Sequence, residues 1–352
     1  MQRPVSGDAA CASISLTRKA CGSIQSGMSA IPWVVMAAAS AVSYYTNPIA
    51  APGEPGYTPM PQHHFRVGFE NDCAFNRDRN YTHGTRLEYV KDITDTTHSY
   101  GITLMQNIYT PEKHARHAVP NQHPYAGYLA LGGAYLLRGK DVGCSFEFQL
   151  GTSGKASLAK DAQKMIHTIG NMEQWNGWKE QVPSELTIQL TSRQDYRMAF
   201  FETETRGGWQ TDGLAYSREA VGTFGIYGGV GLSFRFGRNL PSNMRVNGME
   251  AGNFTRGLID SQSYRPEAAS YFAVLQGEID YVARDLTVDG GVFHSFRYKT
   301  CSRTPWQFHG QLGLGASYHG IDYFVGALFY TRTYRTQSHD SLLGSFAISW
   351  NW

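Results

Sequence analysis

The last nine residues of the chain, 344–352, read GSFAISWNW. Side chains of a strand point alternately to its two faces, so every second residue of this segment shares one face. That face is apolar and largely aromatic, and it is formed by Phe346, Ile348, Trp350 and Trp352. An ordinary amphipathic edge strand is the simpler interpretation, but an exposed aromatic edge would promote aggregation of a soluble protein. The segment therefore favours a strand of a membrane barrel.

The same alternation recurs upstream, in segments of about ten residues that are separated by Gly, Asn and Asp turns. It is seen in FRVGFE at 65–70, GIYGGVGLSFRFG at 225–237 and IDYFVGALFYTRTY at 321–334. A soluble β-sandwich has the same period, but aromatic residues near the strand ends and an export signal favour a membrane barrel. Twelve strands are predicted, near residues 64, 81, 97, 124, 142, 184, 197, 217, 268, 303, 321 and 342.

We therefore expect an all-β protein, a transmembrane antiparallel β-barrel of about twelve strands, because single-chain bacterial barrels have an even strand number. The final segment resembles the carboxy-terminal targeting strand of bacterial outer-membrane barrels. The Gly-, Asn- and Ser-rich segment 238–265 is predicted to be an outside loop.

The composition agrees with this class and excludes others. The chain has 38 Gly, 21 Tyr and 18 Phe with only 17% charged residues, which is typical of aromatic, turn-rich β structure. The formal net charge is +2 and no basic run is interleaved with aromatics, so a nucleic-acid partner is not expected. The five cysteines show neither a CxxC pair nor a zinc spacing, so no disulfide framework or structural zinc is indicated.

The amino terminus has the features of an export signal. Basic residues precede the segment 28–42, MSAIPWVVMAAASAV, and small residues near Ala50 offer a cleavage site. We expect residues 1–51 to be a cleaved leader and residues 52–352 to form a single outer-membrane barrel domain.

One segment has helical rather than strand periodicity. Residues 155–169, KASLAKDAQKMIHTI, carry an apolar stripe formed by Leu158, Ala162, Met165 and Ile169. Thr152 or Ser153 is available as the N-cap. A helix within a barrel sequence must lie in a loop, and its place after the fifth strand predicts a short extracellular helix.

Two polar residues of this helix could carry chemistry. Gln163 and His167 are four residues apart and therefore share a face. A neutral imidazole can take a proton from water, and carboxylates such as Asp72 and Glu173 suit Ca²⁺. A cation of this kind stabilises the oxyanion formed in ester hydrolysis, so together these groups predict an ester hydrolase.

Each residue also has a plainer interpretation. The Asn71-Asp72 pair is common in turns, and Thr82 is compatible with an ordinary strand hydroxyl. An exposed helical histidine is more often solvated than catalytic. Strict alternation places Asn71 on the lipid face and Asp72 inward, so a bulge or a twisted strand end is needed to bring both outward.

Four motifs in this order resemble the outer-membrane lipid A 3'-O-deacylase family, LpxR. They are ENDCAFNRDRNYTHG at 70–84, QNIYTP at 106–111, HPYAGYLALG at 123–132 and QKMIHTIGNMEQWNGW at 163–178. The resemblance implies a twelve-stranded barrel that releases the 3'-linked acyloxyacyl group of lipid A in lipopolysaccharide. The site is then expected between the outer wall and an extracellular helix, with Ca²⁺ as cofactor.

Position by position, the resemblance implies that His167 is the general base and Gln163 its neighbour. Asn71 and Thr82 become wall residues of the catalytic site. Asp72 and Glu173 become the carboxylates that bind the metal. Where the family often has a further Asp, this chain has Cys73.

The resemblance assigns the residues that bind the lipid phosphates less directly. Lys113 matches a family lysine, although the loop differs in length and His114 or Arg116 is a substitute. Lys113 and Arg116 are therefore candidates for binding lipid phosphates. We expect a monomer in the bacterial outer membrane.

Two other functions remain open. A passive channel or adhesin is one, although inward positions rich in Gly and Tyr do not suggest a water-filled lumen. A serine esterase is the other, with Ser153 or Ser184 as nucleophile, but neither lies in a G-x-S-x-G motif.

Overall fold

The computed structural model describes residues 61–352 except 76, 94–96, 114, 242–253 and 255–267. The expected leader, 1–51, lies outside the described residues. Among those described, no helix is long and apolar enough to cross a membrane.

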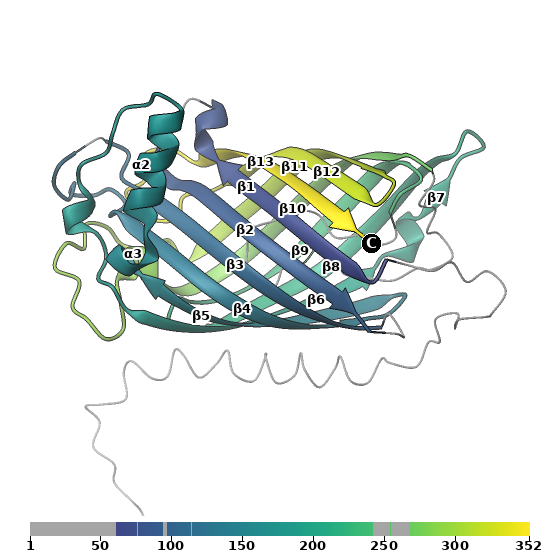
Figure 1. The fold of residues 1–352 in the computed structure, drawn as a ribbon, viewed down its shortest axis with the longest axis horizontal. Coiled ribbons are helices and arrows are strands. Elements are labelled where there is room, and N and C mark those ends of the chain that lie inside the picture. Colours follow the sequence, from purple (N-terminus) through teal and green to yellow (C-terminus); the bar gives the residue numbers. More distant parts are fainter. Residues whose placement is uncertain (1–60, 76, 94–96, 114, 242–253, 255–267) are drawn as a thin grey trace, which may run out of the picture.

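The described chain forms a closed ring of twelve antiparallel strands (Figure 1), which confirms the predicted fold class. The strands are β1 His63–Asn71, β2 Asn80–Asp92, β3 His98–Thr110, β4 Ala126–Arg138, β5 Val142–Ser153, β6 Leu186–Arg197, β8 Trp209–Gly222, β9 Gly225–Arg238, β10 Ser270–Asp285, β11 Trp306–Tyr318, β12 Ile321–Tyr330 and β13 Ser341–Asn351. The two-residue β7, Thr203–Glu204, pairs only with β8 and stands outside the ring. The strands predicted near 197 and 217 in fact begin at Trp209 and Gly225.

The first and last strands close the barrel. β1 pairs with β13 so that Phe65 lies opposite Trp350 and Phe69 opposite Phe346. These residues share the outward face that the sequence alternation predicts, and Phe69 and Phe346 are exposed. Closure pairs the backbone groups at every strand edge, which a sheet in lipid requires.

Charged side chains line the lumen. Buried ion pairs line it, and they include Arg66–Glu88 at 3.3 Å, Arg86–Glu147 at 3.0 Å, Arg193–Asp195 at 2.9 Å and Arg218–Glu278 at 2.6 Å. The expectation of inward positions rich in Gly and Tyr was therefore incomplete. Each arginine has a carboxylate partner because an uncompensated charge at such depth would be strongly destabilising.

The short helices gather mostly at the end of the barrel opposite the chain termini (Figure 1). They are η1 Asp72–Phe75, η2 Gly154–Ser157, α2 Ala159–Ile169, η3 Trp178–Glu180 and α3 Leu286–Asp289, while η4 Ala199–Phe201 lies at the other end. Longer connections typify the extracellular end of bacterial barrels, and we assign the α2 end as extracellular. β9 ends at Arg238 and β10 begins at Ser270, both at the end of the termini, whereas most of the predicted outside loop, 238–265, lies outside the described residues.

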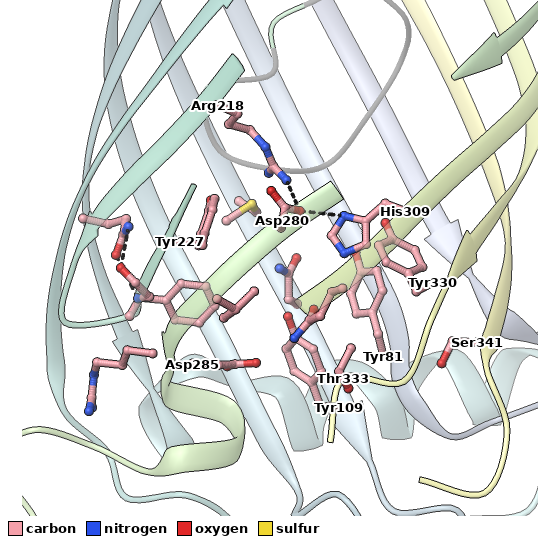
Figure 2. Close-up of a pocket in the computed structure, with 18 of the residues that line it drawn as sticks. Tyr81, Tyr109, Arg218, Tyr227, Asp280, Asp285, His309, Tyr330, Thr333 and Ser341 are labelled. Atoms are coloured by element: carbon pink, nitrogen blue, oxygen red, sulfur yellow. Dashed lines mark hydrogen bonds and ion pairs between the residues drawn. The ribbon is translucent and has the colours of Figure 1, made fainter. Parts of the chain in front are cut away.

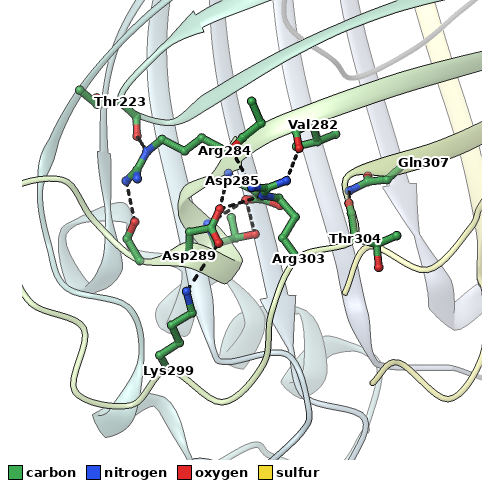
Figure 3. A network of polar contacts seen from close by, with 12 residues as sticks. Thr223, Val282, Arg284, Asp285, Asp289, Lys299, Arg303, Thr304 and Gln307 are labelled. Atoms are coloured by element: carbon green, nitrogen blue, oxygen red, sulfur yellow. Dashed lines mark hydrogen bonds and ion pairs between the residues drawn. The ribbon is translucent and has the colours of Figure 1, made fainter. Parts of the chain in front are cut away.

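A polar network fixes the connection that follows β10 (Figure 3). Asp285 accepts hydrogen bonds from Thr287 N at 2.8 Å and so caps α3. Arg303 pairs with Asp289 at 2.9 Å, and Arg284 donates to the carbonyl of Gly290 at 2.7 Å. These contacts tie β10 to the segment before β11.

Candidate functional site

Helix α2 lies against the outside of the wall, across β3 and β4 (Figure 1). Its contact with the wall is an apolar cluster formed by Ile108, Tyr125, Ala159, Trp175 and Trp178. Gly127 of β4 makes the close approach possible, because a Cβ there would lie 2.3 Å from that of Ala159. The helix is thus fixed to the outer surface, as the resemblance to LpxR implies, and not inside the lumen.

The start of the helix differs from the prediction. Neither Thr152 nor Ser153 caps α2, because Ser153 precedes the separate turn η2. Leu158 is the N-cap, in a left-handed conformation with φ of 59°, and no side chain caps the helix. The residues of α2 that are buried against the wall are Ala159, Gln163 and His167. The polar pair singled out in the sequence therefore faces the wall.

His167 is buried and held at both ring nitrogens. Its Nδ1 lies 2.5 Å from the carbonyl oxygen of Glu173, and its Nε2 lies 3.2 Å from Oδ2 of Asp78. A carbonyl oxygen only accepts, so Nδ1 carries the proton that it donates. Nε2, beside the carboxylate of Asp78, is then the nitrogen that can exchange a proton with a bound group.

Gln163, one turn before His167, is also buried. Its Oε1 accepts a hydrogen bond from Nε1 of Trp178 at 2.8 Å. This contact fixes the orientation of the amide, whose Nε2 is buried and has no hydrogen-bond partner within the described chain. An unused donor therefore lies one turn from the basic nitrogen of His167, where it can donate to a bound group.

Asp72 supplies a second unusual group. The residue is 2% exposed, its Oδ2 accepts from the backbone N of Arg79 at 2.7 Å, and Oδ1 has no partner among the described residues. Burial raises the pKa of Asp72 to about 8, and the nearby charge of Asp78 adds to this. Burial and the same two carboxylates also raise the pKa of the Cys73 thiol. Two carboxylates thus lie together, with His167 next to one of them.

Asn71 and Thr82 lie at the same end of the wall but bond to their neighbours. Asn71 accepts from the backbone N of Cys73 at 2.7 Å, and Thr82 Oγ1 lies 2.7 Å from Oγ1 of Thr110. The expected bulge is present, but it lies in β2, where the register shifts between Tyr81 and His83. Asp72 changes direction for another reason, because it leaves the strand as the first residue of η1.

The remaining predicted residues are more exposed. Glu173 contributes its carbonyl oxygen to His167, while its side chain is exposed. Lys113 and Arg116 are exposed in the β3–β4 connection, and the backbone N of Lys113 donates to Gln122 Oε1 at 2.9 Å. Their roles stay predictions, and His114 lies outside the described residues.

Sequence reasoning missed Asp78. It lies within the motif 70–84, six positions after Asp72, but nothing in a turn of this composition distinguishes it from a solvated loop acid. Only the fold brings it to His167, across 89 positions of sequence. The only signal for Asp78 in the sequence was its position between Asp72 and Thr82, two residues that were already candidates for the site.

A second cluster lies inside the barrel, at a cavity of about 170 Å³ (Figure 2). Glu278, Asp280 and His309 bring potential ligand atoms within 4.8 Å of one another. Arg218, however, lies 2.6 Å from Glu278 and 3.3 Å from Asp280 and already supplies positive charge there. This group was not predicted, and it is distinct from the predicted metal carboxylates Asp72 and Glu173.

The model of the family "Outer membrane protein LpxR" matches residues 33–352. The chain belongs to the LpxR family. The solved LpxR from Salmonella typhimurium has a TM-score of 0.69 at 18% identity and aligns over 82% of this chain and 100% of that one. Membership of LpxR and this shared barrel place the protein in the bacterial outer membrane.

More distant barrels match only loosely. The β domain of the Bordetella autotransporter BrkA has a TM-score of 0.40 at 10% identity and covers 83% of this chain and 98% of its own. The KdgM porin has a TM-score of 0.35 at 7% identity and covers 82% and 99%. No curated protein sequence matches the chain. These two likenesses carry no argument beyond the LpxR match.

Proposed function

We propose that this LpxR-family protein is a lipid A deacylase that hydrolyses the 3'-linked acyloxyacyl ester at the outer wall of the barrel. The observation that supports it most is the position of His167, buried outside the lumen with Nδ1 tied to a carbonyl. Its basic Nε2 is therefore directed to a site that lipid can reach without entering the barrel. Family membership supplies the substrate class.

In this proposal His167 is the general base. It takes a proton from the attacking water at Nε2, and the carbonyl of Glu173 keeps the ring in the required tautomer. Gln163 donates from its unpaired Nε2 to the reacting groups, because Trp178 already fixes its oxygen. Asn71 and Thr82 form the neighbouring wall, and exposed Lys113 and Arg116 bind lipid phosphates.

The residues also fit a hard divalent cation. Asp72 has a buried oxygen without a partner among the described residues, and Asp78 lies beside it in the same electrostatic environment. Oxygen donors of this kind are those that Ca²⁺ prefers. Asp72 and Asp78 would hold the ion, together with the exposed carboxylate of Glu173 from the loop after α2. When bound, Ca²⁺ supplies positive charge against the oxyanion of the ester.

The hydrogen bonds of Ser153 and Ser184 do not support the serine esterase alternative. Ser153 Oγ donates to the carbonyl of Pro183 at 2.7 Å, and Ser184 Oγ accepts from the backbone N of Ala156 at 3.2 Å. Both hydroxyls thus have structural partners. A passive channel fits poorly as well, because buried ion pairs such as Arg86–Glu147 cross the lumen.

The decisive experiment replaces His167 by glutamine. Loss of a general base lowers rates by about 100- to 10,000-fold, and the barrel should still fold because the ring lies outside the sheet. Mass spectrometry of lipid A from cells that produce each form measures the released acyl group. His319→Asn is the matched control, since His319 is exposed with φ of 50° in a turn that asparagine tolerates. Full deacylation by His167→Gln would remove the proposal.

A further inference from the structure

The outer flank of α2 is apolar and uncovered. Leu158, Met165 and Ile169 are 54%, 59% and 80% exposed. With 3.6 residues per turn, these three residues and the half-buried Ala162 share one flank, well away from the wall-facing Gln163. In a protein surrounded by water such a stripe would face the core.

The other flank of the helix is basic. Lys160 and Lys164 are exposed and lie one turn apart, and Lys155 precedes them in η2. None of the three takes part in an ion pair found within the described chain. A helix with an apolar flank and a lysine flank is typical of helices that lie in the boundary between lipid headgroups and acyl chains.

The apolar flank continues a lipid-facing surface that the barrel already has. The strands next to α2 carry large exposed apolar residues, namely Ile102 and Leu104 of β3, Leu131 of β4, Phe148 and Leu150 of β5, and Leu186 and Ile188 of β6. Helix α2 lies on the outside of this wall near one end (Figure 1). In the outer membrane, this belt contacts acyl chains, so the helix extends that contact.

We propose that α2 lies within the outer leaflet, with the flank of Leu158, Ala162, Met165 and Ile169 among acyl chains. Lys160 and Lys164 then face the anionic phosphates of the lipid headgroups. The occupant of this surface is the lipid itself, and its binding does not depend on hydrolysis. The site of His167, on the adjoining face of the same helix, therefore lies at the depth of the lipid ester region.

Fluorescence quenching tests this placement. In a Cys73→Ser background, where the remaining described cysteines Cys144 and Cys301 are buried, a bimane label is attached at Met165→Cys or, as control, at Lys164→Cys. The protein is placed in phosphatidylethanolamine and phosphatidylglycerol vesicles with or without phosphatidylcholine brominated on its acyl chains. The Met165 label should lose most of its emission in brominated vesicles, and the Lys164 label should lose little.

The proposal also predicts which bromine position along the acyl chain quenches the label most strongly. The apolar face of an interfacial helix is buried about 5–10 Å into the boundary, so bromine near the glycerol end should quench more than bromine near the chain terminus. Equal, weak quenching at both positions overturns the proposal. So does a Met165 signal that changes with protein density instead of bromination, which would indicate a second copy on this surface.

Two features of this experiment make its result unambiguous. Ile169→Cys, at the exposed carboxy-terminal end of α2, provides a second label if the Met165 variant does not fold. The readout is quenching and not activity, so failure of lipid contact is distinguishable from failure of the proposed deacylase function. A protein that releases acyl groups while both labels stay unquenched would refute the membrane placement alone.

Discussion

Replacing Gly127 by alanine tests whether close contact between α2 and the wall sets the geometry of the site. The new Cβ would lie 2.3 Å from Cβ of Ala159 and 2.2 Å from Oγ of Ser157. The serine hydroxyl can rotate away, but the alanine carbon moves only with the helix. Carbon atoms in contact are about 3.5 Å apart or more, so α2 must shift outward by about 1.2 Å, the difference from 2.3 Å.

A shift of that size is large for a catalytic group. Misplacement by about 1 Å can lower a rate by about 100-fold, and His167 moves with the helix while Asp72 stays with η1. We therefore expect Gly127→Ala to lower acyl release by about 100-fold without unfolding the barrel. Release from lipid A in vesicles is followed by mass spectrometry, and folding by the mobility of the unheated protein in detergent gels.

Gly133→Ala is the matched control. Gly133 lies on the same outward face of β4, and no atom lies within 4 Å of a Cβ built there. It should retain the parent rate. A Gly127→Ala protein that also works at the parent rate would show that the contact of α2 with the wall does not set the site.

Two more substitutions address charge. Asp78→Asn should raise the Ca²⁺ concentration needed for half-maximal activity, whereas Asp161→Asn on the exposed side of α2 should leave it unchanged; superimposable titrations for all three proteins would contradict a role for Asp78. Arg218→Met leaves Glu278 buried without its main positive partner and should destabilise the barrel by about 3–5 kcal/mol in urea unfolding, and an unaltered midpoint would count against the lumen pair as described.

The barrel is predictable from the sequence because strand alternation is a local and repetitive pattern. The pairing of Phe69 with Phe346 needs only a period of two and a ring that closes. The seventh strand was predicted near residue 197, too early in the sequence. Residues 198–208 instead contain the turn η4 and the short β7, and their sequence pattern resembles that of a membrane-spanning strand. Pattern alone does not distinguish a protruding hairpin from a membrane strand.

The site was predictable only in part. The spacing of Gln163 and His167 placed both on one face, and the structure confirms that this face is buried. The cap at Leu158 was missed because its left-handed conformation follows from the tight turn η2, not from residue preference. Asp78 was missed because a contact between a loop acid and His167 depends on how two distant connections fold over one end of the wall.

The charged filling of the lumen has a consequence for turnover. With Arg86 of β2 paired to Glu147 of β5 across the interior, we expect neither reactant nor product to pass through the barrel. For the proposed deacylase, encounters with the substrate should then occur by two-dimensional diffusion in a single monolayer, and the rate should follow the mole fraction of substrate in that monolayer. Diluting the vesicles in buffer at constant lipid composition would leave the rate per protein molecule unchanged.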